Sequence, residues 1–141
     1  LKDWKALGVK FRKEKLSIDE RLYSTLLLPQ GKKGPAFLAF KNFEVYLKWN
    51  DSFIYTVTAA HLANRLGGAK KYIHKNPSDI LDITSMIKLQ NRLKSRGYDV
   101  GKVDGILGAK TRQAVRLVQL EFGLSADSWP TKELLRKLLI N

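Results

Sequence analysis

The stretch "GYDVGKVDGILGAKTRQAVRLVQLEFGL", residues 97–124, decides the fold of the C-terminal half of this chain. It places five glycines and two aspartates around a regular amphipathic pattern. Glycine accepts backbone conformations with positive φ, and aspartate side chains bond nearby backbone N–H groups. We therefore expect a fixed turn, rather than a flexible loop, that leads into a helix.

The segment "KVDGILGAKT", residues 102–111, gives each turn position a role. Asp104 is expected to bond backbone N–H groups and to tie the turn to the helix that follows, while Gly105 takes a glycine-favoured conformation. Gly108 is expected to allow a tight entry into that helix, and Thr111 to lie in its first turn. These residues either close an inter-helix loop or also form one wall of a binding groove with the preceding helix.

Three helical patterns accompany this turn. Side chains recur at helical spacing in the groups Ile83/Ile87/Gln90/Leu93, Ala114/Val115/Val118/Phe122 and Leu134/Leu135/Leu138. The sequence also contains a faint internal repeat, because Asp104 and Thr111 recur as Asp127 and Thr131 in a copy that is shorter by three residues. We predict a three-helix module over residues 80–141.

The N-terminal part has the pattern of a small α+β unit. "GPAFLAF" and "FEVYLKW" are predicted as the strands of a hairpin, with Lys41-Asn42 between them and Trp49 on the core side. A helix is predicted to begin within residues 50–52, which are all able N-caps, and to end at Gly67.

The polar segment "KKYIHKNPSD", residues 70–79, carries Pro77 and lacks a hydrophobic period. It is predicted as the linker between residues 1–69 and residues 80–141. The predicted fold class is α+β, with a strand hairpin plus helix followed by a three-helix bundle.

The composition narrows the possible partners. The formal net charge of +13 indicates an anionic partner such as nucleic acid, a membrane surface or an acidic cell-wall polymer, although a solvated lysine-rich surface fits as well.

The absence of cysteine excludes a disulfide framework and a thiolate metal site. His61 and His74 have no second ligand at metal-binding spacing, so neither a metal nor a cofactor is expected. The longest apolar run, residues 36–40, is far shorter than the roughly 20 residues that span a bilayer.

The run from residue 89 to residue 124 resembles the three-helix peptidoglycan-binding domain. That family has an L-Q-x-x-L helix, a G-Y, a V-D-G-x-x-G-x-x-T turn, and then A-V-x-x-x-Q and G-L. The matching residues are Leu89, Gln90, Leu93, Gly97, Tyr98, Val103, Asp104, Gly105, Gly108, Thr111, Ala114, Val115, Gln119, Gly123 and Leu124. The sequence departs from the family at Asp127-Ser128, where a second D-G is usual, so the resemblance leaves a ligand contact from that loop open.

The run "LLLPQGKKGPAFLAFKNFEVYLKWNDSFIYTVTAAHLANRL", residues 26–66, is similar to the C-terminal end of the catalytic domain of membrane-bound lytic murein transglycosylases of the B type. The shared features are L-L-L-P-x-G, G-P-A-F-L, N-F and a Tyr/Trp-Asn-x-Ser signature before a helix that ends in A-x-R. They are carried by Leu28, Pro29, Gly31, Gly34, Pro35, Ala36, Phe37, Asn42, Phe43, Trp49, Asn50, Ser52, Tyr55, Ala63 and Arg65.

Enzymes of that family cleave the β-1,4 bond between N-acetylmuramic acid and N-acetylglucosamine without water and leave a 1,6-anhydromuramyl end. One glutamate serves as acid and base. The resemblance implies that this glutamate lies before Leu1, so the chain is expected to be an inactive C-terminal fragment of an active parent. It further implies a monomer in the periplasm or envelope of a Gram-negative bacterium, with any membrane anchor in an unseen N-terminus. Peptidoglycan strands and stem peptides are the expected partners.

The candidate substrate contacts of the first part are Trp49, Asn50, Ser52 and Tyr55. Asn50 either reaches an N-acetyl or hydroxyl group of the glycan or caps a helix. Trp49 and Tyr55 have the aromatic faces that stack on sugar rings, while the strand alternation favours core packing for Trp49.

In the second part, the candidate peptidoglycan contacts are Arg96, Tyr98, Asp104, Gly105, Gly108 and Thr111. Tyr98 either packs on a stem peptide or closes the loop, and Arg96 either attracts muramyl-peptide carboxylates or belongs to a solvated face. A rival class is a basic helix-turn-helix that binds nucleic acid through residues 110–121. The connection over residues 97–108 is longer than the turn of that motif, which argues against it.

Overall fold

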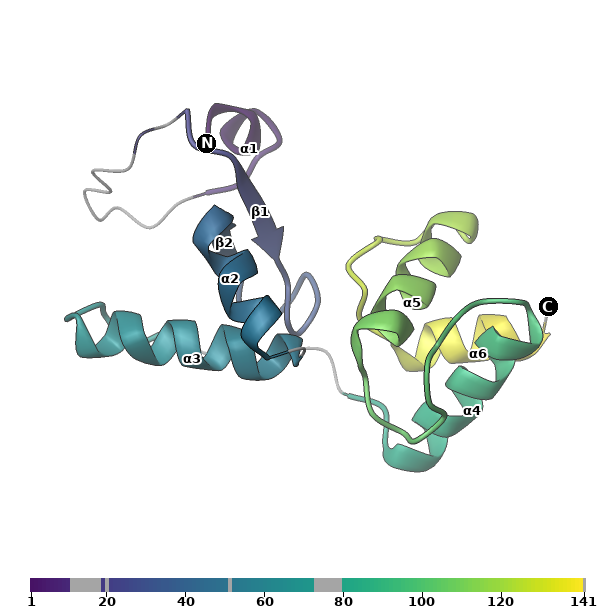
Figure 1. Cartoon of the computed structure of the whole chain (residues 1–141). Coiled ribbons are helices and arrows are strands. Elements are labelled where there is room, and N and C mark those ends of the chain that lie inside the picture. Colours follow the sequence, from purple (N-terminus) through teal and green to yellow (C-terminus); the bar gives the residue numbers. More distant parts are fainter. Residues whose placement is uncertain (11–18, 20, 51, 73–79, 141) are drawn as a thin grey trace.

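The computed structural model describes residues 1–10, 19, 21–50, 52–72 and 80–140. The elements are α1 (Lys2–Ala6), β1 (Ser24–Leu27), β2 (Phe37–Phe40), α2 (Lys41–Trp49), α3 (Phe53–Leu66), α4 (Ile83–Ser95), α5 (Ala109–Glu121) and α6 (Lys132–Ile140). Figure 1 shows the elements up to α3 as one group and α4, α5 and α6 as another. We call residues 1–72 the first unit and residues 80–140 the second unit. The predicted class, a hairpin with helices followed by three helices, is confirmed.

The hairpin differs from the predicted one in the partner of the segment predicted as its first strand. That segment contains β2, and it pairs with the upstream strand β1, which was not predicted. The antiparallel register pairs Ser24 with Phe40, Thr25 with Ala39, Leu26 with Leu38 and Leu27 with Phe37. The segment predicted as the second strand is helix α2, which begins directly after β2. That prediction was wrong because Phe43 and Leu47 lie four residues apart, a spacing that fits both strand alternation and one helical turn. Val45, between them, is exposed, so no strand face is buried here.

Helix α3 begins and ends where the sequence predicts. Ser52 is its N-cap, since Ser52 Oγ accepts the backbone N–H of Tyr55 at 3.3 Å. Asn50 Oδ1 in turn accepts the backbone N–H of Ser52 at 2.9 Å. Gly67 is the C-cap, and Gly68 follows it with φ 91°.

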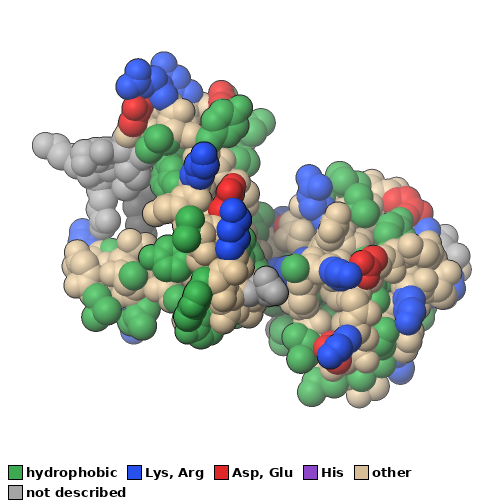
Figure 2. Space-filling view, in the orientation of Figure 1, with side chains coloured by type: hydrophobic (Ala, Val, Ile, Leu, Met, Phe, Trp, Pro, Cys, Tyr) green, Lys and Arg blue, Asp and Glu red, His purple; other side chains and the backbone are tan. Residues whose placement is uncertain are grey.

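The hydrophobic core lies in the second unit. Its buried members are Leu81, Met86, Leu89, Leu93, Val100, Ala114, Val115, Val118, Leu134 and Leu138. Ile83, the first member of the helical pattern in the sequence, is 69% exposed, and Met86 is buried on this helix. In the first unit, large apolar side chains such as Leu22, Val45 and Leu66 are exposed. Figure 2 shows apolar side chains spread over the visible surface of that unit.

The linker prediction lies largely outside the described residues, since residues 73–79, including His74, are not among them. The division into residues 1–69, 70–79 and 80–141 therefore stays a prediction. Within the described ranges, no helix combines the length and the apolar character that crossing a membrane requires.

The loop after β1 hydrogen-bonds to the second unit. Arg112 Nη2 donates to the carbonyl oxygen of Pro29 at 2.9 Å. The backbone N–H of Lys32 donates to Asp127 Oδ2 at 2.9 Å, and Lys32 Nζ donates to Ser125 Oγ at 2.7 Å. In Figure 1 this loop lies on the side of the first unit that faces α5. The two units are thus in direct contact, and we call this contact the junction.

Gly31 packs directly against side chains of the second unit at the junction. It has φ 70°, and a Cβ atom added to it would lie 2.6 Å from Trp129 Cβ and 2.9 Å from Asp127 Oδ2. Real Cβ atoms do not approach other atoms so closely, and residues with a side chain rarely adopt this φ. Only glycine fits this position of the junction.

Acid is expected to destabilise the second unit. Hydrogen bonds from Ser85 lower the pKa of the Asp82 N-cap, and the backbone N–H of Ile106 lowers the pKa of Asp104. A folded-state pKa below the unfolded value of about 4 stabilises the fold above that pH, and this stabilisation is lost as pH falls through the folded value. We expect the melting temperature to fall between about pH 4 and pH 2, and to fall less in Asp82→Asn. A melting temperature that is flat over this range would contradict the expectation.

Candidate functional site

A buried glutamine, Gln90 on α4, holds the glycine-rich turn. Its Oε1 accepts the backbone N–H groups of Asp104 at 3.2 Å and Gly105 at 2.9 Å. Its Nε2 donates to the carbonyl oxygens of Lys102 at 3.2 Å and Ile106 at 3.1 Å. The side chain is fully buried. One amide group therefore satisfies four backbone groups of a loop that has no regular secondary structure.

Gly105 has the glycine-favoured conformation that the sequence predicts. Its φ is 79°, and an added Cβ would lie 2.7 Å from Ile83 Cγ2. Asp104 bonds a backbone N–H group, also as predicted, because its Oδ1 accepts from Ile106 at 2.9 Å. This bond stays within the turn, so the predicted tie from Asp104 to the following helix is wrong.

The link to α5 comes from Thr111, which lies in the first turn of that helix as predicted. Its hydroxyl is buried and donates to the carbonyl oxygen of Val100 at 3.0 Å. Gly108 is the N-cap of α5, with φ −79° and open space where a Cβ would lie. The predicted tight entry at Gly108 is therefore wrong, because an alanine fits there without strain.

The second turn repeats the arrangement of the first. Gln119 Oε1 accepts the backbone N–H of Ser128 at 2.9 Å, and Gln119 Nε2 donates to the carbonyl oxygen of Trp129 at 3.1 Å and to Asp127 Oδ1 at 2.8 Å. Asp127 Oδ1 also accepts the backbone N–H of Trp129 at 3.0 Å. Ser128 has φ 60°, which matches the position of the glycine in the first turn. The faint repeat in the sequence is thus a repeat of hydrogen bonding.

Arg96 and Tyr98 both bind Glu121 at the far end of α5. Arg96 Nη2 forms an ion pair with Glu121 at 2.5 Å, and the Tyr98 hydroxyl donates to the other carboxylate oxygen at 3.1 Å. The Arg96 guanidinium also lies 5.4 Å from the centre of the Phe122 ring. Burial and Glu121 raise the pKa of Tyr98. Arg96 is therefore not part of a freely solvated face, because it closes the loop together with Tyr98.

The candidate contacts of the first unit lie where α2 ends and α3 begins. Trp49 is 74% exposed and Tyr55 is 48% exposed, and their ring centres are 6.0 Å apart at an angle of 44°. The predicted core packing of Trp49 is wrong, because the segment is a helix and this position faces outward. Between these two aromatic residues in the sequence, Asn50 Oδ1 accepts the backbone N–H of Ser52 at the start of α3. The structure thus brings together an exposed aromatic pair and an Asn-Ser cap.

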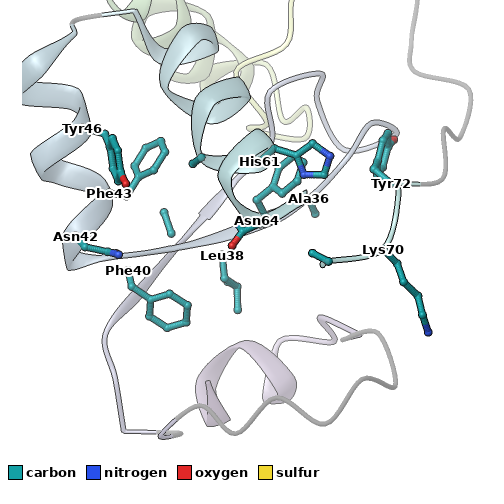
Figure 3. Close-up of a pocket in the computed structure, with 14 residues that line it drawn as sticks. Ala36, Leu38, Phe40, Asn42, Phe43, Tyr46, His61, Asn64, Lys70 and Tyr72 are labelled. Atoms are coloured by element: carbon teal, nitrogen blue, oxygen red, sulfur yellow. The ribbon is translucent and has the colours of Figure 1, made fainter. Parts of the chain in front are cut away.

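A cavity of about 530 Å³ lies between β2, α2 and α3. Figure 3 shows Asn42, Phe43 and Tyr46 on one side of it, and His61 and Asn64 on another. His61 packs against the Phe37 ring, with ring centres 5.7 Å apart. Trp49, Asn50, Ser52 and Tyr55 do not line this cavity. Among the residues that the structure describes, no cluster of three or more potential metal ligands occurs.

Two known families match separate parts of the chain. Residues 1–64 match the family described as "Transglycosylase SLT domain", and residues 84–138 match "Putative peptidoglycan binding domain". The chain joins a transglycosylase SLT domain to a peptidoglycan-binding domain. The boundaries of these matches follow the two units of the structure. The connection from α4 to α5, over residues 96–108, is also longer than a helix-turn-helix allows.

Two solved structures each resemble this chain across both of its domains. The crystal structure of SltB3 from Pseudomonas aeruginosa in complex with NAG-anhNAM-pentapeptide has a TM-score of 0.71 and 39% identity, over 97% of this chain and 38% of SltB3. The SltB3 complex with NAG-NAM-pentapeptide has a TM-score of 0.71 and 38% identity, over 96% of this chain and 37% of SltB3. The SLT and peptidoglycan-binding domains here thus span about two fifths of that protein.

A curated relative matches a shorter part. The spore cortex-lytic enzyme of Bacillus cereus is 46% identical over 55 residues, which cover 37% of this chain and 21% of that enzyme.

Proposed function

We propose that residues 80–141 bind peptidoglycan and that residues 1–69 form part of the catalytic domain of a lytic murein transglycosylase of the membrane-bound B type. The intact enzyme would cleave the MurNAc-GlcNAc β-1,4 bond without water and leave 1,6-anhydromuramyl products. The observation that carries this proposal is the likeness to SltB3 at 39% identity over 97% of the chain, across both domains. SltB3 is seen with a NAG-anhNAM-pentapeptide, which contains the anhydro product end.

The same likeness supports a place in the bacterial cell envelope, where peptidoglycan lies. We further propose the periplasm of a Gram-negative bacterium and a monomeric state. Glycan strands and stem peptides are the proposed partners, and no cofactor is invoked, since acid–base catalysis by one glutamate is sufficient for the reaction.

The exposed pair of Trp49 and Tyr55 is the proposed contact with the glycan. A pyranose ring presents an apolar C–H face, which packs well on an exposed aromatic plane. Asn50 stands beside the pair in sequence, and its Oδ1 is held by the Ser52 backbone. We therefore assign Trp49 and Tyr55 to sugar stacking, and Asn50 and Ser52 to holding the helix start that positions them.

The purified 141-residue chain is expected to bind peptidoglycan sacculi without releasing 1,6-anhydromuropeptides. Glu44 lines a cavity of about 360 Å³ between the hairpin and α2, and it is the carboxylate to test as a local acid. Several other described carboxylates hold structural bonds, including Asp82, Asp104 and Glu121. We propose that none of these carboxylates is the acid–base glutamate of the intact enzyme. Glu44→Gln is therefore expected to leave sacculus binding unchanged, and neither chain is expected to release 1,6-anhydromuropeptides.

Sedimentation with sacculi, with chitin and double-stranded DNA as controls over a salt series, tests the binding. Binding to DNA with a steep salt dependence, together with no binding to sacculi, would contradict the proposed function. Release of anhydromuropeptides that disappears in Glu44→Gln would show that the active site lies in this chain.

A further inference from the structure

A cleft of about 270 Å³ lies at the junction between the two units. The first unit contributes Leu26, Leu27, Leu28 and Phe53 to its wall, and the second unit contributes Arg112, Arg116, Ala126, Asp127 and Ser128. None of these residues is among the substrate contacts considered above. The cleft is therefore separate from the aromatic pair of the first unit and from the first turn of the second.

Arg112 carries a buried positive charge at this cleft. The residue is 8% exposed, and its guanidinium lies 5.0 Å from the centre of the Phe53 ring and 5.8 Å from that of Trp129. Burial lowers the pKa of Arg112 to about 10, so the group remains charged at neutral pH.

Among the described residues, this charge has no acidic partner. Arg112 Nη2 donates to the carbonyl oxygen of Pro29, while the buried Nε has no hydrogen-bond partner. No carboxylate within the described ranges forms an ion pair with Arg112. Buried charges in proteins are ordinarily paired, because the loss of hydration is costly. The cleft thus contains a buried guanidinium that forms no ion pair with a described carboxylate.

Arg116 adds a second guanidinium to the same cleft. It lies four residues after Arg112 on α5, which places both side chains on one face of the helix. Arg116 is exposed, and it makes no hydrogen bond or ion pair with the residues that the structure describes. A free guanidinium suits a carboxylate, because its planar fork donates two parallel N–H bonds.

Asp127, the acidic residue in the cleft wall, already accepts hydrogen bonds from other groups of the protein. Its Oδ1 accepts from Gln119 and from the Trp129 backbone, and its Oδ2 accepts from the Lys32 backbone. Two arginines and one aspartate leave the lining net positive. The leucine and phenylalanine walls lower the local dielectric constant, which strengthens the attraction between these arginines and an anion.

We propose that this cleft binds a carboxylate of the peptidoglycan stem peptide, with Arg116 as its direct partner and Arg112 as a fixed charge behind it. The inference rests on the proposed function, because the stem peptide is the carboxylate-bearing ligand of that function. A peptide held in the cleft contacts both units at once, so it is bound only while the junction is closed.

The test is a calorimetric titration of the 141-residue chain with soluble NAG-NAM-pentapeptide and with the same compound after its carboxylates are converted to amides. Arg116→Gln is expected to weaken binding of the acid form about 10-fold, since hydrogen bonds to charged groups are the stronger kind. It should leave binding of the amidated form unchanged. Arg136→Gln is the matched control, because it removes one exposed arginine from α6, outside the cleft, and it should change affinity less than about twofold.

Equal affinity for the acid and amidated compounds, or equal affinity of the Arg116→Gln and Arg136→Gln chains, overturns the cleft site. Sedimentation with sacculi separates this result from the proposed function. If the unmodified chain sediments with sacculi while Arg116→Gln has no effect on peptide binding, only the cleft assignment fails. If the unmodified chain does not bind sacculi, the proposed function itself fails.

Discussion

Gln90→Ala is expected to lower the free energy of unfolding of the second unit by about 3 kcal/mol. The substitution leaves the backbone N–H groups of Asp104 and Gly105 without their acceptor, and a buried unsatisfied polar group costs about 1–3 kcal/mol. It also removes the donor to the carbonyl oxygens of Lys102 and Ile106. Urea denaturation followed by circular dichroism measures this loss.

Two further variants show whether hydrogen bonding is the cause. Gln113→Ala removes an exposed glutamine from α5 and should change stability by less than about 0.5 kcal/mol. Gln90→Glu keeps the size of the side chain but replaces the donor with a second acceptor, so it should also destabilise. A Gln90→Ala chain as stable as Gln113→Ala would show that the turn holds without the glutamine.

Gly31→Ala is expected to open the junction. The added Cβ would lie 2.6 Å from Trp129 Cβ, and an alanine at φ 70° is strained in any surroundings. Overpacking against Trp129 costs about 1–3 kcal/mol in the docked form alone, so the undocked form should gain at least about fivefold in population. Small-angle X-ray scattering should show a larger radius of gyration, and a protease should cut faster within residues 70–79.

Gly123→Ala separates the two causes. Gly123 has φ 63°, with open space where a Cβ would lie, so alanine there carries the conformational cost alone. It should lower stability without changing the radius of gyration. If Gly31→Ala and Gly123→Ala chains scatter identically, the close approach to Trp129 does not hold the junction.

The second unit was predictable because its signals are local. The helical spacing of Val115 and Val118, and the glycine and aspartate of the first turn, each constrain a few neighbouring residues. The role of Gln90 in holding the turn was not predictable from local spacing, although a glutamine at this position belongs to the family pattern. Its partners lie 12 to 16 residues further along the chain, and only the folded loop shows which polar groups need a bond.

The first unit and the junction were harder to predict, for a related reason. The side chains of α2 fit two periods, and the choice between strand and helix depends on what covers each face. The bond from Lys32 to Asp127 spans 95 residues, a separation that no local pattern encodes. The sequence likewise leaves two interpretations of Arg96 open, because its partner Glu121 lies 25 positions away.

The two buried glutamines have a consequence for where this module is able to fold. Domains of about 60 residues often depend on disulfides or a structural metal to fix long loops. This chain has no cysteine, and Gln90 and Gln119 each cross-link a loop to a helix through one amide group. Such cross-links need no oxidant and no metal supply. The module is therefore able to assemble equally well in a reducing compartment and in an oxidising one.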